Sequence, residues 1–415
     1  MIAKALLMTL AFGLAGVALG AASDPVPVPP PSAKAVRYHE TGIPLWFASR
    51  AWGLAVPALI LASGLSVRIR NLARGQGRPW LVMVATYGVA YLAVDFLLGL
   101  PLRYYAGFVR AHEYGLSVQS FGRWLGDALK GLGVEMVGAV LFLWVPYAIM
   151  ARSPRRWWLY VGLLALPFAA SMALIAPVAI DPLFNEFGPM KDKALEARID
   201  ALAKRAGIDG GQIFEVDKAR DTRTVNAYVT GLGATKRIVL WDTLLARLDG
   251  DEVLAVMGHE MGHYVLNHVA QGLILSSVGT LVSLGLIYLA SGRLLRRFGA
   301  RFGVEGVADL ASLPLLLVLG NGLMLAGSPI INGFSRHLEH EADRFALEIT
   351  RGNRPAALAF AKLQEDNLAV PYPGRVWTLW RASHPPIGER IEFCNSYRPW
   401  ESGGPSRYGS LFREP

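Results

Sequence analysis

The sequence is poor in cysteine and in charged side chains. Cys394 is its single cysteine, which excludes an intramolecular disulfide framework and any metal site built from several cysteines. Only 18% of the 415 residues are Asp, Glu, Lys or Arg, against roughly 25% in typical globular domains, and 53% are hydrophobic. The hydrophobic residues fall in long runs, so the composition argues against an ordinary soluble protein and favours an integral membrane protein.

Acidic residues are also fewer than basic ones. The 41 Lys and Arg exceed the 32 Asp and Glu, which gives a formal net charge of +9. The arginines lie mostly beside the apolar runs, where membrane topology explains them better than a phosphate-binding surface does. We therefore expect no nucleic-acid partner.

The first fifty residues contain no ordinary globular pattern. Residues 1–22 carry one early positive charge, an apolar stretch and the small residues Gly20-Ala21-Ala22, which is typical of a secretory signal peptide or of an uncleaved first span. Residues 23–50 are expected to form a linker, because the proline-rich stretch 25–32 favours extended backbone over helix.

Six further apolar segments have about the length that a helix needs to cross the hydrocarbon of a bilayer. They are residues 51–67, 80–100, 134–150 and 157–180 in the N-terminal membrane part (51–180), and 266–290 and 310–331 in a second membrane part (266–331). The chain thus has about seven spans, or six after signal cleavage. Asp95 and Glu135 lie within these spans, and an intramembrane carboxylate usually faces the bundle interior or a water-filled cavity. A hydrated helix end is the alternative for Glu135.

Three arginine-rich loops predict the orientation of the spans. Alternation places all three on one side of the membrane, and the positive-inside rule makes that side cytoplasmic. The loops contain Arg68, Arg70, Arg74 and Arg78; Arg152, Arg155 and Arg156; and Arg293, Arg296, Arg297 and Arg301. Residues 181–265 and the C-terminal region then lie on the extracytoplasmic side, which suggests the inner membrane of a bacterium.

The remaining residues predict a small α+β domain made from two parts of the chain. The first part, 181–265, is expected to contain a helix over Glu186–Gly207, strands at Ile213–Val216, Val225–Val229 and Arg237–Trp241, and a helix that begins near Glu252 and continues towards the membrane. The second part, 332–400, is expected to contain helices over Ser335–Thr350 and Arg354–Leu368. Residues 401–415, rich in Gly, Ser, Pro and Arg, are expected to be disordered.

The sequence His259-Glu260-Met261-Gly262-His263 is an H-E-x-x-H motif on the helix that begins near Glu252. At 100° per residue the two histidines are only 40° apart, so both imidazoles can reach one metal ion. Glu260 falls on the adjoining face, where it can act as general base on a water molecule without being a ligand. The motif predicts a metallopeptidase site with one zinc ion.

A catalytic zinc site needs a third protein ligand, which two histidines do not supply. His268 is excluded, because nine residues from His259 place it on the opposite face of the helix. Glu339 and Asp343 are spaced i, i+4 on the later helix, so one of them, with Glu339 favoured, can bind the metal while the other stays on the same face. Asp343 can then fix the orientation of a ligating histidine.

Five groups of residues occur together in one known family. They are Asn226-Ala227-Tyr228 with Lys236–Leu240 and Asp242–Leu245; Gly258–Tyr264; Phe334-Ser335-Arg336, Glu339, Ala342-Asp343 and Phe345-Ala346; Ser383–Pro386 with Glu389-Arg390-Ile391; and, less closely, Tyr104–Leu116. Through them, residues 80–395 resemble the zinc-dependent CAAX prenyl protease type 1 family of integral membrane gluzincin peptidases.

The resemblance implies a set of functions for these residues. It makes Glu339 the third zinc ligand, and it places Asn226 and Ala227 on an edge strand that pairs with an extended substrate. It places His384 and Arg390 opposite the zinc, where they would stabilise the oxyanion. The family fold is a ring of seven helices around a water-filled chamber, capped by the metallopeptidase domain. Asp95 would line that chamber.

The expected function is therefore a membrane-embedded zinc endopeptidase that acts on C-terminal, lipidated or membrane-associated peptides. Family members act on prenylated proteins at a cytosol-facing site, whereas the arginine loops here place the metal on the other side. Quality control of membrane proteins by the same chemistry is thus an alternative. A non-catalytic scaffold or transporter with a degenerate site is a second, against which the intact His259, Glu260, His263 and Glu339 argue.

Overall fold

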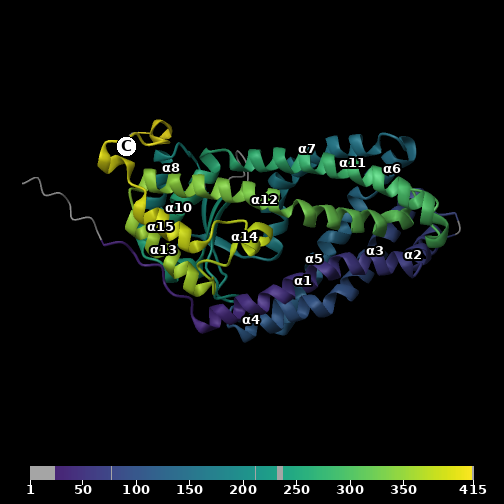
Figure 1. Ribbon diagram of the computed structural model, residues 1–415, viewed down its shortest axis with the longest axis horizontal. Coiled ribbons are helices and arrows are strands. Elements are labelled where there is room, and N and C mark those ends of the chain that lie inside the picture. The colour runs from purple at the N-terminus through teal and green to yellow at the C-terminus, as the bar shows by residue number, and fades with distance from the viewer. Residues whose placement is uncertain (1–23, 76, 211, 231–236, 414–415) are drawn as a thin grey trace, which may run out of the picture.

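The computed structural model describes residues 24–75, 77–210, 212–230 and 237–413. The signal peptide or first span expected at 1–22 lies outside these residues. Long helices run side by side through one half of the molecule, and shorter helices with a small sheet form the other half (Figure 1).

Within the described residues, six helical stretches are long and apolar enough to cross a membrane, as the sequence predicts. They are Ala33–Ala62, Trp80–Glu113, Phe121–Arg152, Trp157–Leu183, His268–Phe302 and Leu310–Thr350. Large apolar side chains on them, such as Leu163, Ile274 and Leu289, are more than half exposed. Exposure to hydrocarbon removes the cost that such side chains would have in water, which fits a chain folded in a bilayer.

The helices of the N-terminal membrane part are α1 (Ala33–Ala62), α2 (Leu65–Arg74), α3 (Trp80–Tyr104), α4 (Arg110–Glu113), α5 (Phe121–Phe142), α6 (Trp144–Arg152) and α7 (Trp157–Ile175). Helix α1 begins well before the expected residue 51, because Ser32 caps it by accepting the N–H of Ala35 at 3.1 Å. The linker expected over 23–50 is therefore wrong after residue 32.

Residues 24–32, here called the N-terminal strap, are extended as expected but packed on the soluble half. The side-chain amide of Asn395 accepts from the Val26 N–H at 3.0 Å and donates to its carbonyl at 2.8 Å. Gln364 donates to the Pro29 carbonyl at 2.7 Å, and Val26 is only 5% exposed. Side chains replace the backbone partners that a proline-rich segment lacks.

The soluble half combines a four-stranded sheet with the ends of two membrane helices. Its elements are β1 (Phe187–Pro189), α8 (Lys193–Arg205), β2 (Gln212–Val216), β3 (Ala227–Thr230), β4 (Arg237–Trp241), α9 (Asp242–Arg247), α10 (Gly250–Val265), α11 (His268–Phe302), α12 (Leu313–Thr350), α13 (Asn353–Asp366), α14 (Arg375–Arg381) and α15 (Ile387–Ser396). The strand order is β1-β2-β4-β3, with β2 and β4 parallel and the other pairs antiparallel. Strand β3 is therefore at an edge.

Strand β1 lies where the sequence predicts the start of a helix. Gly188 and Pro189 disfavour helix there, and α8 begins only at Lys193, after Asp192 accepts the Leu195 N–H at 2.9 Å. The other three strands lie close to their predicted positions.

Helix α12 is continuous from the membrane half into the soluble half. The domain boundary expected between residues 331 and 332 thus falls inside one helix. Its second half packs with α10 against the sheet, through the fully buried Met257, Met261 and Phe345. A rigid helix therefore connects the membrane to the residues expected to bind metal.

Helices α10 and α11 are two helices and not the single one predicted. Asn267 between them has a left-handed backbone with φ of 57°. Asparagine tolerates this conformation better than most residues, so it can redirect the chain here.

The C-terminal tail is ordered through Arg413, contrary to the expected disorder. The buried carboxylate of Glu348 accepts the backbone N–H groups of Arg407 and Tyr408 at 2.8 and 2.7 Å. The Tyr408 side chain packs in the core beside Phe345. A buried carboxylate needs such donors, and this need outweighs the polar composition of the tail.

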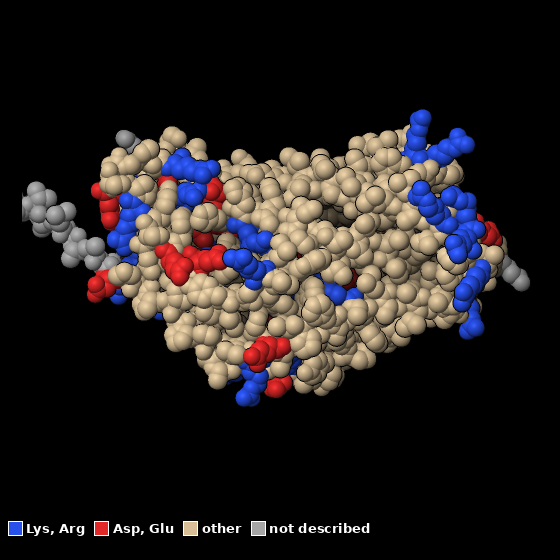
Figure 2. Space-filling model, viewed as in Figure 1, with Lys and Arg blue, Asp and Glu red and all other residues tan. Residues whose placement is uncertain are grey.

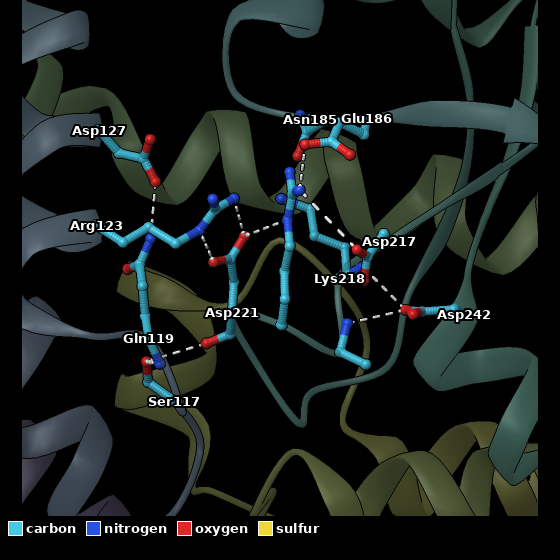
Figure 3. A network of polar contacts seen from close by, with 12 residues as sticks. Ser117, Gln119, Arg123, Asp127, Asn185, Glu186, Asp217, Lys218, Asp221 and Asp242 are labelled. Atoms are coloured by element: carbon cyan, nitrogen blue, oxygen red, sulfur yellow. Dashed lines mark hydrogen bonds and ion pairs between the residues drawn. The ribbon is translucent and has the colours of Figure 1, made fainter.

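Two loops join the membrane half to the sheet (Figure 3). Segment 116–118 pairs antiparallel with residues 221–223, through Val118 N–H to the Asp221 carbonyl and Arg223 N–H to the Leu116 carbonyl, both 3.1 Å. The Asp221 carboxylate also accepts from the Arg123 guanidinium at the start of α5. These bonds fix the chain directly before β3.

Asp95 and Glu135 line one cavity in the membrane half, together with Arg103 and Asn321. The cavity lies between α1, α3, α5 and α12 and has a volume of about 560 Å³. This agrees with the expectation that an intramembrane carboxylate faces an interior space.

Candidate active site

The start of α10 is fixed by a capping box. Asp249 accepts the N–H of Glu252 at 2.9 Å, and Glu252 accepts that of Asp249 at 2.8 Å. From this start the helix directs His259 and His263, one turn apart, towards α12. Both side chains thus reach the carboxylate of Glu339.

Two glycines allow α10 to approach α12 closely. A Cβ atom on Gly258 would lie 3.2 Å from the Ala346 Cα, and one on Gly262 would lie 3.2 Å from the Ala342 Cα. Both distances are too short for comfortable packing, so a side chain at either position would push the helices apart. The small residues therefore determine how near Glu339 comes to the two histidines.

His259, His263 and Glu339 offer three ligand atoms within 4.8 Å of one another. The Nε2 atoms of the histidines are 3.1 Å apart, and the Glu339 oxygens lie 3.2 Å from His259 Nε2 and 3.5 Å from His263 Nε2. Donors about 2.0–2.1 Å from one tetrahedral zinc ion lie about 3.3 Å from each other. The spacing therefore fits a tetrahedral metal ion.

The chemistry of the donors also fits a metal ion. Burial lowers the pKa of His263 to about 3, which keeps its imidazole neutral. Glu339 Oε2 is buried and has no hydrogen-bond partner among the described residues. A cation between these groups would satisfy both the ring lone pairs and this oxygen.

Asp343 supports His259 from behind. Its Oδ1 lies 2.8 Å from His259 Nδ1, the ring nitrogen away from the other two ligand residues. Arg390 binds the same carboxylate through two hydrogen bonds, of 2.6 and 2.8 Å. Asp343 thus has the contact expected of a residue that orients a ligating histidine. Arg390 reaches the site mainly through Asp343, and its part in oxyanion stabilisation stays a prediction.

His268 supports His263 in the same way, which the sequence does not predict. The turn at Asn267 brings His268 Nδ1 to 2.9 Å from His263 Nδ1. Treating this region as one continuous helix excludes His268 as a metal ligand. That reasoning does not predict the contact between His268 and His263. Asn267, a residue that readily takes a left-handed backbone, was the signal available in the sequence.

Glu260 lies beside the metal-binding group and is half-buried. Burial raises the pKa of its carboxyl to about 7, and the Val229 backbone N–H donates to it. A carboxyl that titrates near neutral pH can accept a proton and return it, as a general base requires.

A groove of about 430 Å³ runs beside these residues, lined by Asn226, Ala227, His259, Glu260 and His384, among others. Ala227 is the first residue of β3, and no strand pairs with the outer edge of β3 in the described part of the chain. Asn226 Oδ1 accepts the Ala227 N–H at 2.9 Å. In the part of the chain that the structure describes, the sheet can therefore be extended along the groove at this edge.

His384 lies across the groove from α10. Its Nε2 is 3.3 Å from Glu339 Oε1, and its Nδ1 is 2.9 Å from the Ser383 hydroxyl. The structure thus brings together all the residues predicted for the site.

Comparison with family models gives two matches that together cover most of the chain. Residues 189–398 match the model described as peptidase family M48. Residues 32–186 match the model described as the CAAX prenyl protease N-terminal region with five membrane helices.

Relatives from distant organisms cover most of the same residues. The chain is 35% identical to the uncharacterized metalloprotease YhfN of Bacillus subtilis, over 90% of this chain and 88% of YhfN. It is 30% identical to CAAX prenyl protease 1 of Saccharomyces cerevisiae, over 72% of this chain and 69% of that protein. The crystal structure of Ste24p from S. mikatae matches with a TM-score of 0.74 and 26% identity, over 86% of this chain and 87% of that one.

Proposed function

Because the chain belongs to peptidase family M48, we propose that the group of His259, His263 and Glu339 is the zinc site of a membrane-embedded endopeptidase. The chain is a metallopeptidase and an integral membrane protein by this membership and by its six membrane-length helices. Zinc as the metal, and the function of each residue, are our proposals. The single observation that carries them is the convergence of three ligand atoms within 4.8 Å beside Glu260.

A zinc ion bound there would polarise the scissile carbonyl and increase the acidity of a water molecule. His259, His263 and Glu339 would hold the ion, and Asp343 keeps the His259 ring in place. Glu260 takes the proton from the attacking water and passes it to the leaving amine. No serine or cysteine nucleophile is needed, and burial raises the pKa of Cys394, which keeps that thiol unreactive.

The substrate binds as an added strand along β3. Ala227 and Asn226 offer backbone and amide groups, so recognition depends on main-chain hydrogen bonds more than on side-chain pockets. His384 lies across the groove from α10, and Arg390 lies behind His259 on the Asp343 carboxylate. We propose that both stabilise the developing oxyanion, His384 by a hydrogen bond and Arg390 by its positive charge.

The substrates we propose are C-terminal, lipidated or membrane-associated peptides. Three features support this: relatives named CAAX prenyl protease 1, the connection of the site to the bilayer through α12, and the groove beside it. Quality control of membrane proteins is the second candidate, because the arginine loops predict an extracytoplasmic site, where prenylated substrates are not expected. The charge distribution supports this orientation, because Lys and Arg gather near α2 and α6, at the end of the molecule opposite the soluble half (Figure 2).

Two carboxylate substitutions test this assignment. Glu260→Gln keeps the shape of the side chain but cannot accept a proton, so zinc should remain bound while peptide turnover falls by about 10²–10⁴-fold. Glu339→Ala removes a ligand, so it should lower zinc affinity. Zinc stoichiometry and hydrolysis of a quenched peptide are measured on the purified protein. Loss of zinc from Glu260→Gln, with zinc and activity kept by Glu339→Ala, would show that both assignments are wrong. Unchanged hydrolysis in both variants would remove the zinc-peptidase proposal.

A further inference from the structure

The groove beside β3 is closed at one end by Asn367, which follows α13. The Val225 N–H donates to Asn367 Oδ1 at 3.3 Å, and Asn367 Nδ2 donates to the Val225 carbonyl at 3.5 Å. One side-chain amide therefore occupies both backbone groups of Val225, only two residues before Ala227. A peptide that pairs with β3 cannot continue to pair there without displacing Asn367.

The chain before Val225 is covered as well. Segment 116–118 pairs with residues 221–223, and Arg123 holds the Asp221 carboxylate (Figure 3). The strand edge is thus available at Ala227 and beyond but is blocked on the N-terminal side. A bound peptide has room for only a few residues in that direction, because each extended residue spans about 3.3 Å.

A second cavity of about 240 Å³ adjoins the closed end. It shares Asn367 and Ala369 with the groove and lies against α1, α4 and α14. Its polar walls are Tyr38, His39, Arg110 and Arg381, with Trp377 beside them. We call this cavity the basic pocket.

Arg110 of the basic pocket is 93% buried, since its exposed fraction is 7%. Its guanidinium lies 3.9 Å from the centre of the Tyr38 ring, and Nη2 donates to the Tyr38 carbonyl and, at 3.4 Å, to the Thr41 hydroxyl. Its Nε has no hydrogen-bond partner within the described residues. A buried guanidinium with neutral partners alone leaves a positive charge uncompensated.

Arg381 brings a second positive charge to the same cavity. Arg381 is exposed as a whole residue and stacks on Trp377 at 4.5 Å, and partial burial together with the charges of Arg110 and Arg50 lowers its pKa. Neither Arg110 nor Arg381 forms an ion pair with a carboxylate among the residues that the structure describes. Two guanidinium groups without an acidic partner favour an anionic ligand, and a planar carboxylate matches their geometry.

We propose that the basic pocket binds the C-terminal carboxylate of the substrate, which makes Arg110 and Arg381 specificity-determining residues. This inference rests on the proposed function, because it needs a peptide bound along β3. The substrate enters with its C-terminus towards Asn367, and the terminal carboxylate lies between the two arginines. The pocket thereby favours cleavage of peptide bonds that lie a few residues from the C-terminus of the substrate over cleavage of bonds inside a long chain.

Two quenched peptides that differ only at the C-terminus test the inference. One ends in a free carboxylate and the other in a carboxamide, and neither has an acidic side chain. We expect the purified full-length protein to show a kcat/KM about 10-fold or more lower on the carboxamide, since a hydrogen-bonded charge is lost. Arg381→Gln should lower turnover of the free acid towards that of the carboxamide. Arg375→Gln, at the other end of α14 and outside the pocket, is the matched control and should keep the wild-type ratio.

Arg110→Lys is the second variant, because it keeps the buried charge but loses the two-pronged donor. It should also reduce the preference for the free acid. Equal turnover of the two peptides by the wild type, or an unchanged preference in both pocket variants, would overturn the inference while leaving the peptidase intact. Failure of the proposed function gives a different result: neither peptide is hydrolysed, or Glu260→Gln hydrolyses both as the wild type does.

Discussion

Each histidine of the proposed zinc site is held from behind by a second polar side chain. Asp343 contacts Nδ1 of His259, and His268 contacts Nδ1 of His263. A ligating imidazole that donates its other N–H has a fixed tautomer and orientation. The two histidines therefore depend on different partners, and His268 can be tested separately from the ligands.

His268→Ala removes the partner of the His263 Nδ1 atom without touching a ligand. Zinc affinity should fall by about 10–100-fold, the scale typical of such outer partners. His268→Gln offers an amide oxygen in place of the imidazole nitrogen and should restore part of the affinity. Zinc affinity is measured by competition with a chelator. If the His268→Ala protein binds zinc as tightly as the wild type, the contact between His268 and His263 does not contribute to metal binding.

At the scale of single residues, the sequence predicts those site residues whose function follows from their spacing along a helix. His259 and His263 share a helix face by arithmetic, and Glu339 follows from the need for a third ligand and from the family motif. His268 and Asn367 could not be predicted in the same way. Their contacts depend on the left-handed turn at Asn267 and on where the end of α13 meets Val225, and neither has a periodic signal.

At the scale of elements, the contact between α10 and α12 determines whether the site forms. Gly258 and Gly262 lie on the face of α10 that meets Ala346 and Ala342. The H-E-x-x-H motif leaves its two central positions free, and in this chain one of them is the glycine that the packing requires.

Gly262→Val should separate the two helices and move Glu339 away from the histidines. We expect a loss of about 1–3 kcal/mol in stability from overpacking and a lower zinc content. Gly279→Val in α11 is the control, since a Cβ there meets no atom within 4 Å. Thermal unfolding and zinc stoichiometry are compared for the two variants. Equal zinc content in both would mean that the close helix approach is not needed for the site.

Element boundaries were predicted less well than element types. The membrane helices and three strands follow from hydrophobic runs and β-prone residues. The early start of α1, the short strand β1 and the ordered tail through Arg413 do not. Each depends on a tertiary contact that composition does not encode, such as the two N–H groups that Glu348 accepts from the tail.

At the scale of the whole molecule, the basic end and the metal-binding end lie at opposite ends of the long helices (Figures 1 and 2). We expect the arginine loops to be cytoplasmic and the metal site extracytoplasmic. Labelling of introduced cysteines can test this, because Cys394 is buried and is the one native thiol. Lys193→Cys on α8 should react with a membrane-impermeant maleimide in intact spheroplasts. Arg74→Cys on α2 should react only after permeabilisation, and the reverse pattern would place the site in the cytoplasm.

The N-terminal strap has a consequence for the order in which the protein matures. Val26 pairs with Asn395, which is 369 positions later in the chain, and Pro29 pairs with Gln364. A ribosome must therefore complete α13 and α15 before the strap finds its partners, while α1 is already being inserted into the bilayer. Contacts of such long range form late. Arg390 is on α15 together with Asn395, so a chain released before this helix is made lacks both the last contacts of the strap and the arginine that holds Asp343. The nascent protease consequently gains its complete active site only near the end of translation, after its membrane helices have been made.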